Sequence, residues 1–358
     1  MKRFCFIFLL VLFVFSFSSY ATIFQLTNND VEDFHPSLYN GCIAWERGHN
    51  ESSEIYYYNG SSIIRITNNN EYDVWPSLYD GTIAWQRGSG SNDWSEIYYW
   101  NGNETIRMTN NSTCDETPSL YNGTIAWRGG FEGGHQEDSE ILYWDGNTTM
   151  QVTNNGYYDY LPSLHNGTIA WYGSPGNIGG AVYYWNGSTT TQIANNINGW
   201  WPSLYNGSIA WTGFESPGDG GEIYYWDGEN AIKLTDNSYM DIYPSLYDGT
   251  IAWSGRDSID GDLEIFYWNG EEVIQITNNN YTDQLPSLYN GTIAWDATDG
   301  TDTELFYWDG GNLDMAPLPP PEPTEQPIPE PSTILLLSTG IGGIATYGLI
   351  RRKKGIAL

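Results

Sequence analysis

Short runs of alternating apolar and polar residues, separated by Asn-Gly or Asp-Gly pairs, fill the chain from Thr22 to Asp314. A period of two in segments rich in Tyr, Trp, Ile and Thr is typical of half-buried β-strands. Asn-Gly and Asp-Gly favour tight hairpins, because both central residues of such a turn need positive φ. The sequence shows no convincing amphipathic helix in this region. The pattern therefore predicts an all-β domain.

One phrase recurs along this region: Pro-Ser-Leu, a Tyr or His, Asn-Gly or Asp-Gly, one further residue, then Ile-Ala-Trp. Successive copies lie 40 to 44 residues apart, which is the length of a four-stranded propeller blade. Seven repeats predict a seven-bladed β-propeller. The prolines that mark the repeats are Pro36, Pro76, Pro118, Pro162, Pro202, Pro244 and Pro286.

The second repeat shows the expected blade. Its strands are predicted, from the inside outwards, at Pro76–Tyr79, Thr82–Trp85, Glu96–Trp100 and Thr105–Thr109, with a variable loop between the second and third. The last repeat stops before an outer strand, and Thr22–Thr27 carries the phrase that is missing there. We therefore expect the two ends of the domain to complete one blade together and to close the ring.

The two ends of the chain predict export. Residues 1–21 have the charged start, apolar run and small-residue exit of a signal peptide. After the propeller at 22–314 come an acidic, proline-rich linker at 315–331 and an apolar segment at 332–350, long enough to cross a bilayer. The basic tail at 351–358 is expected to stay in the cytoplasm. Its charges are Arg351, Arg352, Lys353 and Lys354.

The C-terminal segment resembles a PEP-CTERM sorting domain. Pro329, Glu330, Pro331 and Ser332 stand directly before the apolar stretch, and the basic run follows it. The resemblance implies recognition by an exosortase-type membrane enzyme, with the helix serving as a membrane anchor before processing. It also implies the cell surface or extracellular matrix of a Gram-negative bacterium as the destination. An ordinary C-terminal membrane anchor is the alternative.

The repeat itself resembles the TolB-type propeller, a relative of the WD-repeat fold. The phrase that carries this resemblance is Leu/Ile-Thr-Asn-Asn, an Asp, Pro-Ser-Leu-Tyr, Asn/Asp-Gly, Ile-Ala-Trp and then Glu-Ile-Tyr-Tyr. It spans about residues 22 to 310. The resemblance implies a binding platform, with enzymes as a minority.

Charge narrows the choice of partners. The chain has 44 acidic residues against 13 basic ones and a net charge of −31. Such a surface repels phosphate backbones, so we exclude nucleic acid as a partner. Exopolysaccharide or a surface protein is the expected ligand. Solubility alone would also account for the acidity.

Propeller geometry separates two faces. The Asn/Asp-Gly hairpins fall on one face, here called the hairpin face, and the long variable loops and blade crossovers fall on the other, here called the loop face. Ligands are expected on the loop face. Aromatic residues that do not repeat there are the candidate contacts: Trp75, Trp200, Trp201 and Tyr243.

Two carboxylates recur in the repeats. An Asp stands three residues before the proline in all blades except one, where Gly199 replaces it, and a Glu opens the third strand except at Ala181. We expect each Glu to meet the next crossover. The Asp set is interpreted as structural turn caps or, alternatively, as cation ligands, with calcium as the cofactor. This set is Asp33, Asp73, Asp115, Asp159, Asp241 and Asp283.

Catalytic signatures are weak. The histidines, such as His35 and His165, are scattered over blades and faces, and the sequence contains no GxSxG nucleophile motif. The expected function is therefore a non-catalytic binding or scaffold module outside the cytoplasm. The alternative is a lyase or hydrolase that degrades extracellular polysaccharide with loop-face carboxylates.

Overall fold

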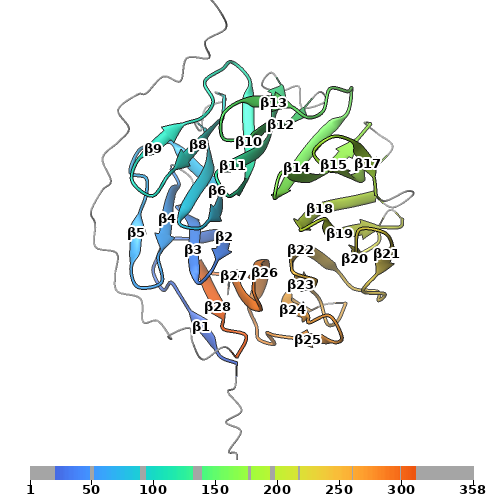
Figure 1. Ribbon diagram of the computed structural model, residues 1–358. Coiled ribbons are helices and arrows are strands. Elements are labelled where there is room, and N and C mark those ends of the chain that lie inside the picture. Colours follow the sequence, from blue (N-terminus) through green and yellow to red (C-terminus); the bar gives the residue numbers. More distant parts are fainter. Residues whose placement is uncertain are drawn as a thin grey trace, which may run out of the picture.

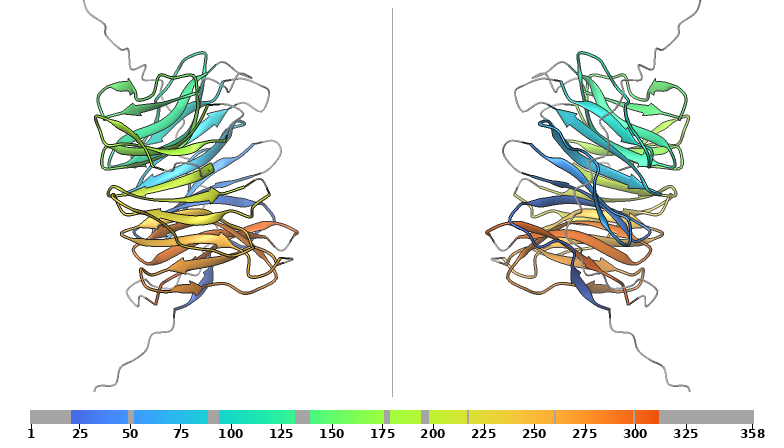
Figure 2. Two further views of the ribbon diagram at one scale, coloured as in Figure 1. Left: turned by 90° about the vertical axis from the view of Figure 1, so that its right-hand side faces the viewer. Right: turned by 90° about the vertical axis from the view of Figure 1, so that its left-hand side faces the viewer.

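The computed structural model forms a ring of seven four-stranded antiparallel sheets arranged around a central axis (Figure 1). Two side views show that the ring is a flattened disc (Figure 2). The structure describes residues 21–48, 52–88, 94–131, 139–175, 179–193, 198–216, 218–259, 261–298 and 300–311. This architecture confirms the predicted all-β, seven-bladed propeller.

The innermost strand of each blade lines the channel, and the second strand follows it through the Asn/Asp-Gly hairpin. The innermost strands are β2 (Asp33–Tyr39), β6 (Tyr72–Tyr79), β10 (Cys114–Tyr121), β14 (Tyr158–His165), β18 (Asn198–Tyr205), β22 (Asp241–Tyr247) and β26 (Thr282–Tyr289). The second strands are β3 (Cys42–Arg47), β7 (Thr82–Gly88), β11 (Thr124–Phe131), β15 (Thr168–Ser174), β19 (Ser208–Phe214), β23 (Thr250–Gly255) and β27 (Thr292–Thr298).

The third and fourth strands form the outer half of each blade. The third strands are β4 (Glu54–Tyr58), β8 (Glu96–Trp100), β12 (Glu140–Trp144), β16 (Ala181–Trp185), β20 (Glu222–Trp226), β24 (Glu264–Trp268) and β28 (Thr303–Trp308). The fourth strands are β5 (Ile63–Arg65), β9 (Thr105–Arg107), β13 (Thr149–Gln151), β17 (Thr190–Gln192), β21 (Ala231–Lys233), β25 (Val273–Gln275) and β1 (Ile23–Gln25).

Ring closure follows the prediction. The N-terminal strand β1 pairs with β28, so that Phe24 lies opposite Tyr307, and the last blade has the order β1-β28-β27-β26. The backbone N–H of Leu26 continues this pairing by donating to the carbonyl of Leu305 at 2.7 Å. Strands from opposite ends of the domain therefore share one blade, which leaves no unpaired third strand there.

Three predicted strand limits are corrected. The second strand of the second blade ends at Gly88 instead of Trp85, because its pairing with the inner strand continues to Tyr72. In the second blade the inner strand begins at Tyr72 instead of Pro76, because a bulge lets pairing continue on both sides of the proline. The outer strand ends at Arg107 instead of Thr109. Beyond Arg107 the Thr109 hydroxyl accepts the N–H of Ile97, which replaces the strand ladder at that point.

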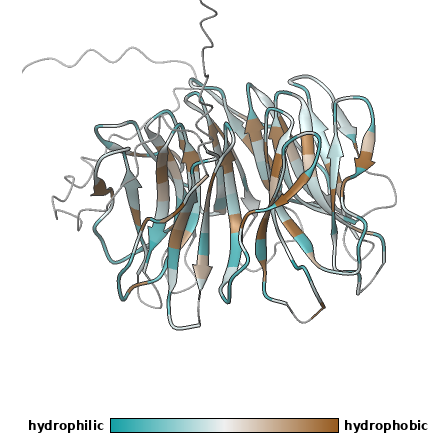
Figure 3. Cartoon of the chain, turned by 90° about the horizontal axis from the view of Figure 1, so that it is seen from below, coloured by the Kyte–Doolittle hydropathy of each residue, from teal (hydrophilic) through white to brown (hydrophobic). Residues whose placement is uncertain are grey.

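The hydrophobic core lies between blades. Seven clusters of buried side chains each join two neighbouring blades. The Trp that ends Ile-Ala-Trp is at most 3% exposed in all blades, which fits its predicted packing role. Hydrophobic colouring accordingly falls mainly within the strands (Figure 3).

The predicted signal peptide, linker, apolar segment and basic tail lie outside the described residues, apart from Ala21 at the predicted cleavage point. Within the part of the chain that the structure does describe, no helix is long and apolar enough to cross a membrane.

Candidate functional site

The residue directly before each repeat proline has a left-handed backbone, although none of the seven is glycine. Their φ angles lie between 49° and 57°. A β-bulge at this point of the inner strand, as between Val74 and Ser77, turns the backbone and re-aims the side chain. These pre-proline residues are His35, Trp75, Thr117, Leu161, Trp201, Tyr243 and Leu285.

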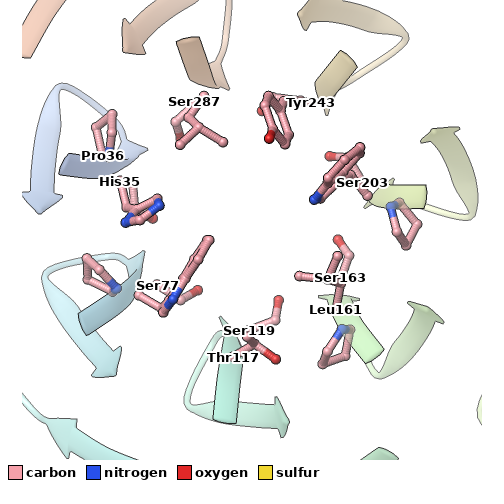
Figure 4. A pocket seen from close by; sticks show the side chains of 18 of the residues that line it. His35, Pro36, Ser77, Thr117, Ser119, Leu161, Ser163, Ser203, Tyr243 and Ser287 are labelled. Carbon is pink, nitrogen blue, oxygen red and sulfur yellow. The ribbon is translucent and has the colours of Figure 1, made fainter. Parts of the chain in front are cut away.

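All seven pre-proline side chains line one cavity of about 290 Å³ in the channel, together with the following Pro and Ser of each blade. Figure 4 shows His35, Thr117, Leu161 and Tyr243 arranged around the opening. The cavity brings together residues about 40 positions apart in sequence. The variable residues that precede the seven prolines converge there.

Three of the four predicted contact residues meet at this cavity. Trp75, Trp201 and Tyr243 line it, and the ring centroids of Trp201 and Tyr243 lie 4.5 Å apart. They were predicted in or beside the loop face, and they lie on the inner strands β6, β18 and β22, which begin before the proline and carry them to the cavity wall. Trp200 does not line the cavity: its ring stacks on Tyr172 with centroids 4.1 Å apart and lies 5.7 Å from the ring of Trp201.

Four cavity residues were missed as ligand contacts. They are His35, Thr117, Leu161 and Leu285. The available signal was their position: each occupies the same site before Pro-Ser-Leu as Trp75 and Trp201. Aromatic type alone was therefore a poorer guide than position in the repeat.

A polar cluster breaks the sevenfold symmetry at the first blade. His35 Nδ1 lies 3.1 Å from Glu46 Oε1, and the His35 ring stacks on Trp75 with centroids 3.9 Å apart. The backbone N–H of His35 donates to Asp296 Oδ2 at 3.1 Å, and that of Trp75 donates to Glu46 Oε2 at 2.8 Å. Both carboxylates thus hold the N–H of a strained pre-proline residue in the next blade.

Burial and charge oppose each other in this cluster. Burial disfavours protonation of His35, yet the hydrogen bond and charge of Glu46 and the charge of Asp296 raise the pKa of its imidazole above the ordinary value. Burial raises the pKa of Asp296 to about 7, against the charge and N–H of His35. A protonated His35 is therefore compensated by carboxylates that lie beneath the cavity wall.

A ring of serines fixes the channel below the pre-proline residues. The Ser of each Pro-Ser-Leu accepts, through Oγ, the N–H of the Leu in the next blade, and all seven bonds measure 2.9 Å. The last of these joins Ser287 to Leu38 and closes the circle. The Ser and Leu of the Pro-Ser-Leu phrase thus hydrogen-bond each blade to the next one.

A belt of seven aromatic rings closes the circle at the hairpin face. Neighbouring centroids are 4.3 to 4.7 Å apart all the way round. Burial and the hydroxyl of Tyr79 raise the pKa of Tyr121. His165 replaces a tyrosine in the belt, and its Nδ1 accepts the N–H of Asn206 at 3.0 Å. The members are Tyr39, Tyr79, Tyr121, His165, Tyr205, Tyr247 and Tyr289.

The repeated carboxylates form a relay from blade to blade. Glu96 Oε1 of the second blade accepts the N–H of Asn111 in the crossover at 3.0 Å, and Asn111 Nδ2 donates to Asp115 Oδ2 of the third blade at 2.6 Å. Asp115 Oδ1 in turn accepts the indole N–H of Trp127 at 2.9 Å. The expectation that each Glu meets the next crossover is confirmed here. The predicted turn-cap role of the Asp is wrong, because its carboxylate accepts side-chain hydrogen bonds.

The same Asp–Trp hydrogen bond occurs in six blades, at 2.6 to 2.9 Å. In the remaining blade Gly199 leaves no room for a side chain, since a Cβ there would lie 2.8 Å from Val182 Cγ2 and 3.0 Å from Trp211 Cδ1. The indole nitrogen of Trp211 is buried without an acceptor among the described residues. Because Gly199 replaces the Asp and Ala181 replaces the Glu, the chain of hydrogen bonds from Glu to Asp to Trp is missing between these two blades.

The Asp side chains point into separate blades. Across the described ranges, no group of three or more His, Cys, Asp or Glu side chains has an arrangement that could hold a metal ion. The sorting motif, from Pro329 to Ser332, lies beyond the residues that the structure describes.

The fold resembles known propeller domains. The propeller domain of the trilobed protease from Pyrococcus furiosus, described as having an open velcro topology, matches with a TM-score of 0.62 and 14% identity over 80% of this chain and 95% of that one. An acylaminoacyl peptidase from Pyrococcus horikoshii matches at 0.61 and 12%, over 78% and 51% of the two chains. The chain spans about half the length of this peptidase.

A puromycin-hydrolysing peptidase of Mycobacterium tuberculosis has a TM-score of 0.60 and 12% identity, with 81% of this chain and 55% of that one covered. No family model matches the sequence, and no curated protein matches it. At these identities the likeness concerns the fold: this is a seven-bladed propeller like those in peptidases.

Proposed function

We propose that this protein is a non-catalytic binding module whose ligand enters the central cavity from the loop face. The observation that carries the proposal is the convergence of all seven pre-proline side chains on one cavity. These positions vary while the flanking Pro, Ser and Leu do not, which is the expected pattern for a specificity surface on a rigid scaffold.

The backbone strain supports this role. A non-glycine residue in the left-handed region costs on the order of 1 to 3 kcal/mol, and such strain collects at ligand sites. Here the strain occurs seven times at the same position. A bulge that only interrupted the strand would not need large side chains such as Trp75 and Trp201 there.

We further propose that the protein acts outside the cytoplasm. Support comes from the signal-peptide pattern of residues 1–21 and from the PEP-CTERM-like tail, with Pro329 to Ser332 as the motif for an exosortase-type enzyme. The destination is the cell surface or extracellular matrix of a Gram-negative bacterium.

An enzyme that degrades polysaccharide is the alternative, and the polar cluster of His35, Glu46 and Asp296 is the observation in its favour. The geometry favours a structural role for these carboxylates. Glu46 is 7% exposed and Asp296 is fully buried, and each accepts a backbone N–H of the neighbouring blade. Glycoside hydrolysis instead requires two carboxyl groups that face the sugar.

Likeness to the propeller domain of a protease suggests a second candidate ligand, a peptide. Co-sedimentation of the full chain with the host's exopolysaccharide, with and without calcium, tests the proposal, together with an assay for released oligosaccharide. Binding without product release is the expected result. Released product would make the protein an enzyme, and failure to bind would leave the peptide candidate.

A further inference from the structure

The described wall of the cavity carries no Asp, Glu, Lys or Arg side chain. This is unusual for a chain with a net charge of −31. A peptide terminus or a metal ion would leave its charge unpaired in such a site, which costs several kcal/mol. The one ionisable imidazole, that of His35, is already matched by Glu46. The wall therefore favours an uncharged ligand.

The wall offers ring faces and polar hydrogens. Trp75, Trp201 and Tyr243 supply aromatic surface, and Trp75 is 37% exposed. Their indole N–H and hydroxyl groups can donate hydrogen bonds beside the apolar faces. A pyranose has a matching surface, because its C–H groups present an apolar face and its hydroxyl groups accept hydrogen bonds at the edge.

The ring architecture restricts how a chain molecule can enter. Strands from all seven blades surround the cavity, and the aromatic belt stands at its hairpin end. Neighbouring belt centroids 4.3 to 4.7 Å apart place the rings about 5 Å from the axis. Since carbon atoms approach to about 3.5 Å, the belt admits a single file of atoms and excludes a sugar ring.

The volume of the cavity fits only a short segment of a ligand. A cavity of about 150 Å³ holds one benzene molecule, so about 290 Å³ suits one or two six-membered rings. An internal segment of a long polysaccharide can cross the mouth of the cavity, but it reaches the Ser ring only by threading the channel or by doubling back within about 290 Å³. A chain end can reach the Ser ring below the aromatic residues without either.

We infer that the cavity binds the terminal unit of a neutral saccharide chain end-on. This inference rests on the proposed binding function and adds the ligand class and its orientation. The chain end enters from the loop face, stacks on Trp75 and Trp201, and stops above the aromatic belt.

The test uses the full chain on an array of neutral gluco-, manno- and galacto-oligosaccharides of two to eight units, each attached through its reducing end. The sugars that bind are then titrated in solution by tryptophan fluorescence. We expect the Kd per chain end to change less than about twofold between four and eight units. A Kd that falls steadily with length would indicate a groove and overturn the inference.

Matched variants locate the site. Leu occurs naturally at two pre-proline positions, Leu161 and Leu285, with the same backbone conformation, so Trp75→Leu and Trp201→Leu retain a residue that this conformation accepts. Each is expected to weaken binding by about tenfold, the value of one aromatic stacking contact. Trp94→Leu removes an exposed ring that does not line the cavity and should leave the Kd unchanged.

Other outcomes separate this inference from the proposed function. If sugars bind equally to wild type and Trp201→Leu, the cavity assignment is wrong and a binding module remains. The same holds if the array is negative but the exopolysaccharide co-sediments, or if peptides with free termini bind in place of sugars. If the array, the exopolysaccharide and the peptides are all negative, both proposals fail.

Discussion

The indole nitrogen of Trp253 donates a hydrogen bond of 2.7 Å to Oδ1 of Asp241, twelve residues earlier in the same blade. Both side chains are buried, at 1% and 2% exposure. The equivalent Trp211 in the preceding blade has Gly199 in place of the Asp, and its indole nitrogen is left without an acceptor in the described structure. The protein thus contains, in otherwise similar blades, both the Asp–Trp hydrogen bond and a position where glycine replaces the Asp and the bond is absent.

The Trp253–Asp241 hydrogen bond predicts that a Trp→Phe substitution lowers the free energy of unfolding more at position 253 than at position 211. Trp253→Phe removes a donor from the buried Asp241 carboxylate, whereas Trp211→Phe removes a donor that has no acceptor. Because a lost buried hydrogen bond costs about 1 to 3 kcal/mol, Trp253→Phe should lower the free energy of unfolding by about 1 to 2 kcal/mol more. Urea unfolding of both variants measures the difference, and equal values would contradict the prediction.

The ring of serines predicts that the loss of one Ser–Leu hydrogen bond between blades lowers the stability of the protein. Ser163→Ala leaves the N–H of Leu204 without its acceptor at the blade interface. We expect the free energy of unfolding to fall by about 1 to 2 kcal/mol, with a matching fall in Tm. Ser258→Ala, at an exposed serine, is the control and should change stability by less than 0.5 kcal/mol, roughly the effect of an ordinary surface substitution.

Buried carboxylates predict higher stability at mildly acidic pH. Burial raises the pKa of Asp115 and Asp241 to about 6 and that of Asp283 and Asp296 to about 7. Between about pH 4 and pH 7 the folded state therefore holds more protons than the unfolded state, and stability falls as pH rises through this window. Thermal unfolding should give a higher Tm at pH 5 than at pH 8.

A variant isolates one contribution to this pH dependence. Asp296→Asn keeps an acceptor for the N–H of His35 but cannot ionise. The difference in Tm between pH 5 and pH 8 should become smaller in this variant, because one buried group no longer loses a proton. An unchanged difference would show that Asp296 does not titrate in this range.

Backbone strain predicts a stabilising substitution. Thr117 is β-branched and has a φ of 49°, a conformation that Asn tolerates better. Thr117→Asn should raise the free energy of unfolding by about 0.5 to 1 kcal/mol. Thr190→Asn, on the exposed outer strand β17, is the control and should give no gain. A loss of stability in Thr117→Asn would show that the Thr117 side chain contributes more than the strain costs.

The C-terminal motif predicts a change in location. Under the proposed sorting by an exosortase-type enzyme, Glu330→Ala should leave the protein in the inner membrane, because the enzyme would no longer recognise the motif before the apolar segment. Fractionation of cells that carry wild type or the variant measures this. Release of both proteins to the same extent would contradict sorting through Pro329 to Ser332.

Much of the fold was predictable from local signals. Asn40-Gly41 and its six equivalents fix the hairpins, and the seven prolines give the number of blades. The pairing of Phe24 with Tyr307 was expected because one strand phrase was missing at the end and present at the start. The contact between Glu96 and the following crossover was also predicted from the sequence. The repeat Glu is replaced by Ala181 and the Asp of the next blade by Gly199, so the two residues are lost together.

Less of the candidate site was predictable. Trp75, Trp201 and Tyr243 were named, but so was Trp200, which does not line the cavity. Residue type could not separate Trp200 from Trp201, because strand direction and the bulge decide which of two neighbours faces the channel. The Asp–Trp hydrogen bonds were missed because their partners lie on different strands.

The sequence by itself determined the repeat, its turns, the strand count and the closure of the ring. These features depend on short-range chemistry: the φ preferences of Asn-Gly, the alternation of buried positions and the spacing of prolines. Only the tertiary structure decided that seven variable residues share one uncharged cavity bounded by an aromatic belt. Those residues are about 40 positions apart, and they converge because each strained pre-proline backbone turns its side chain toward the same axis.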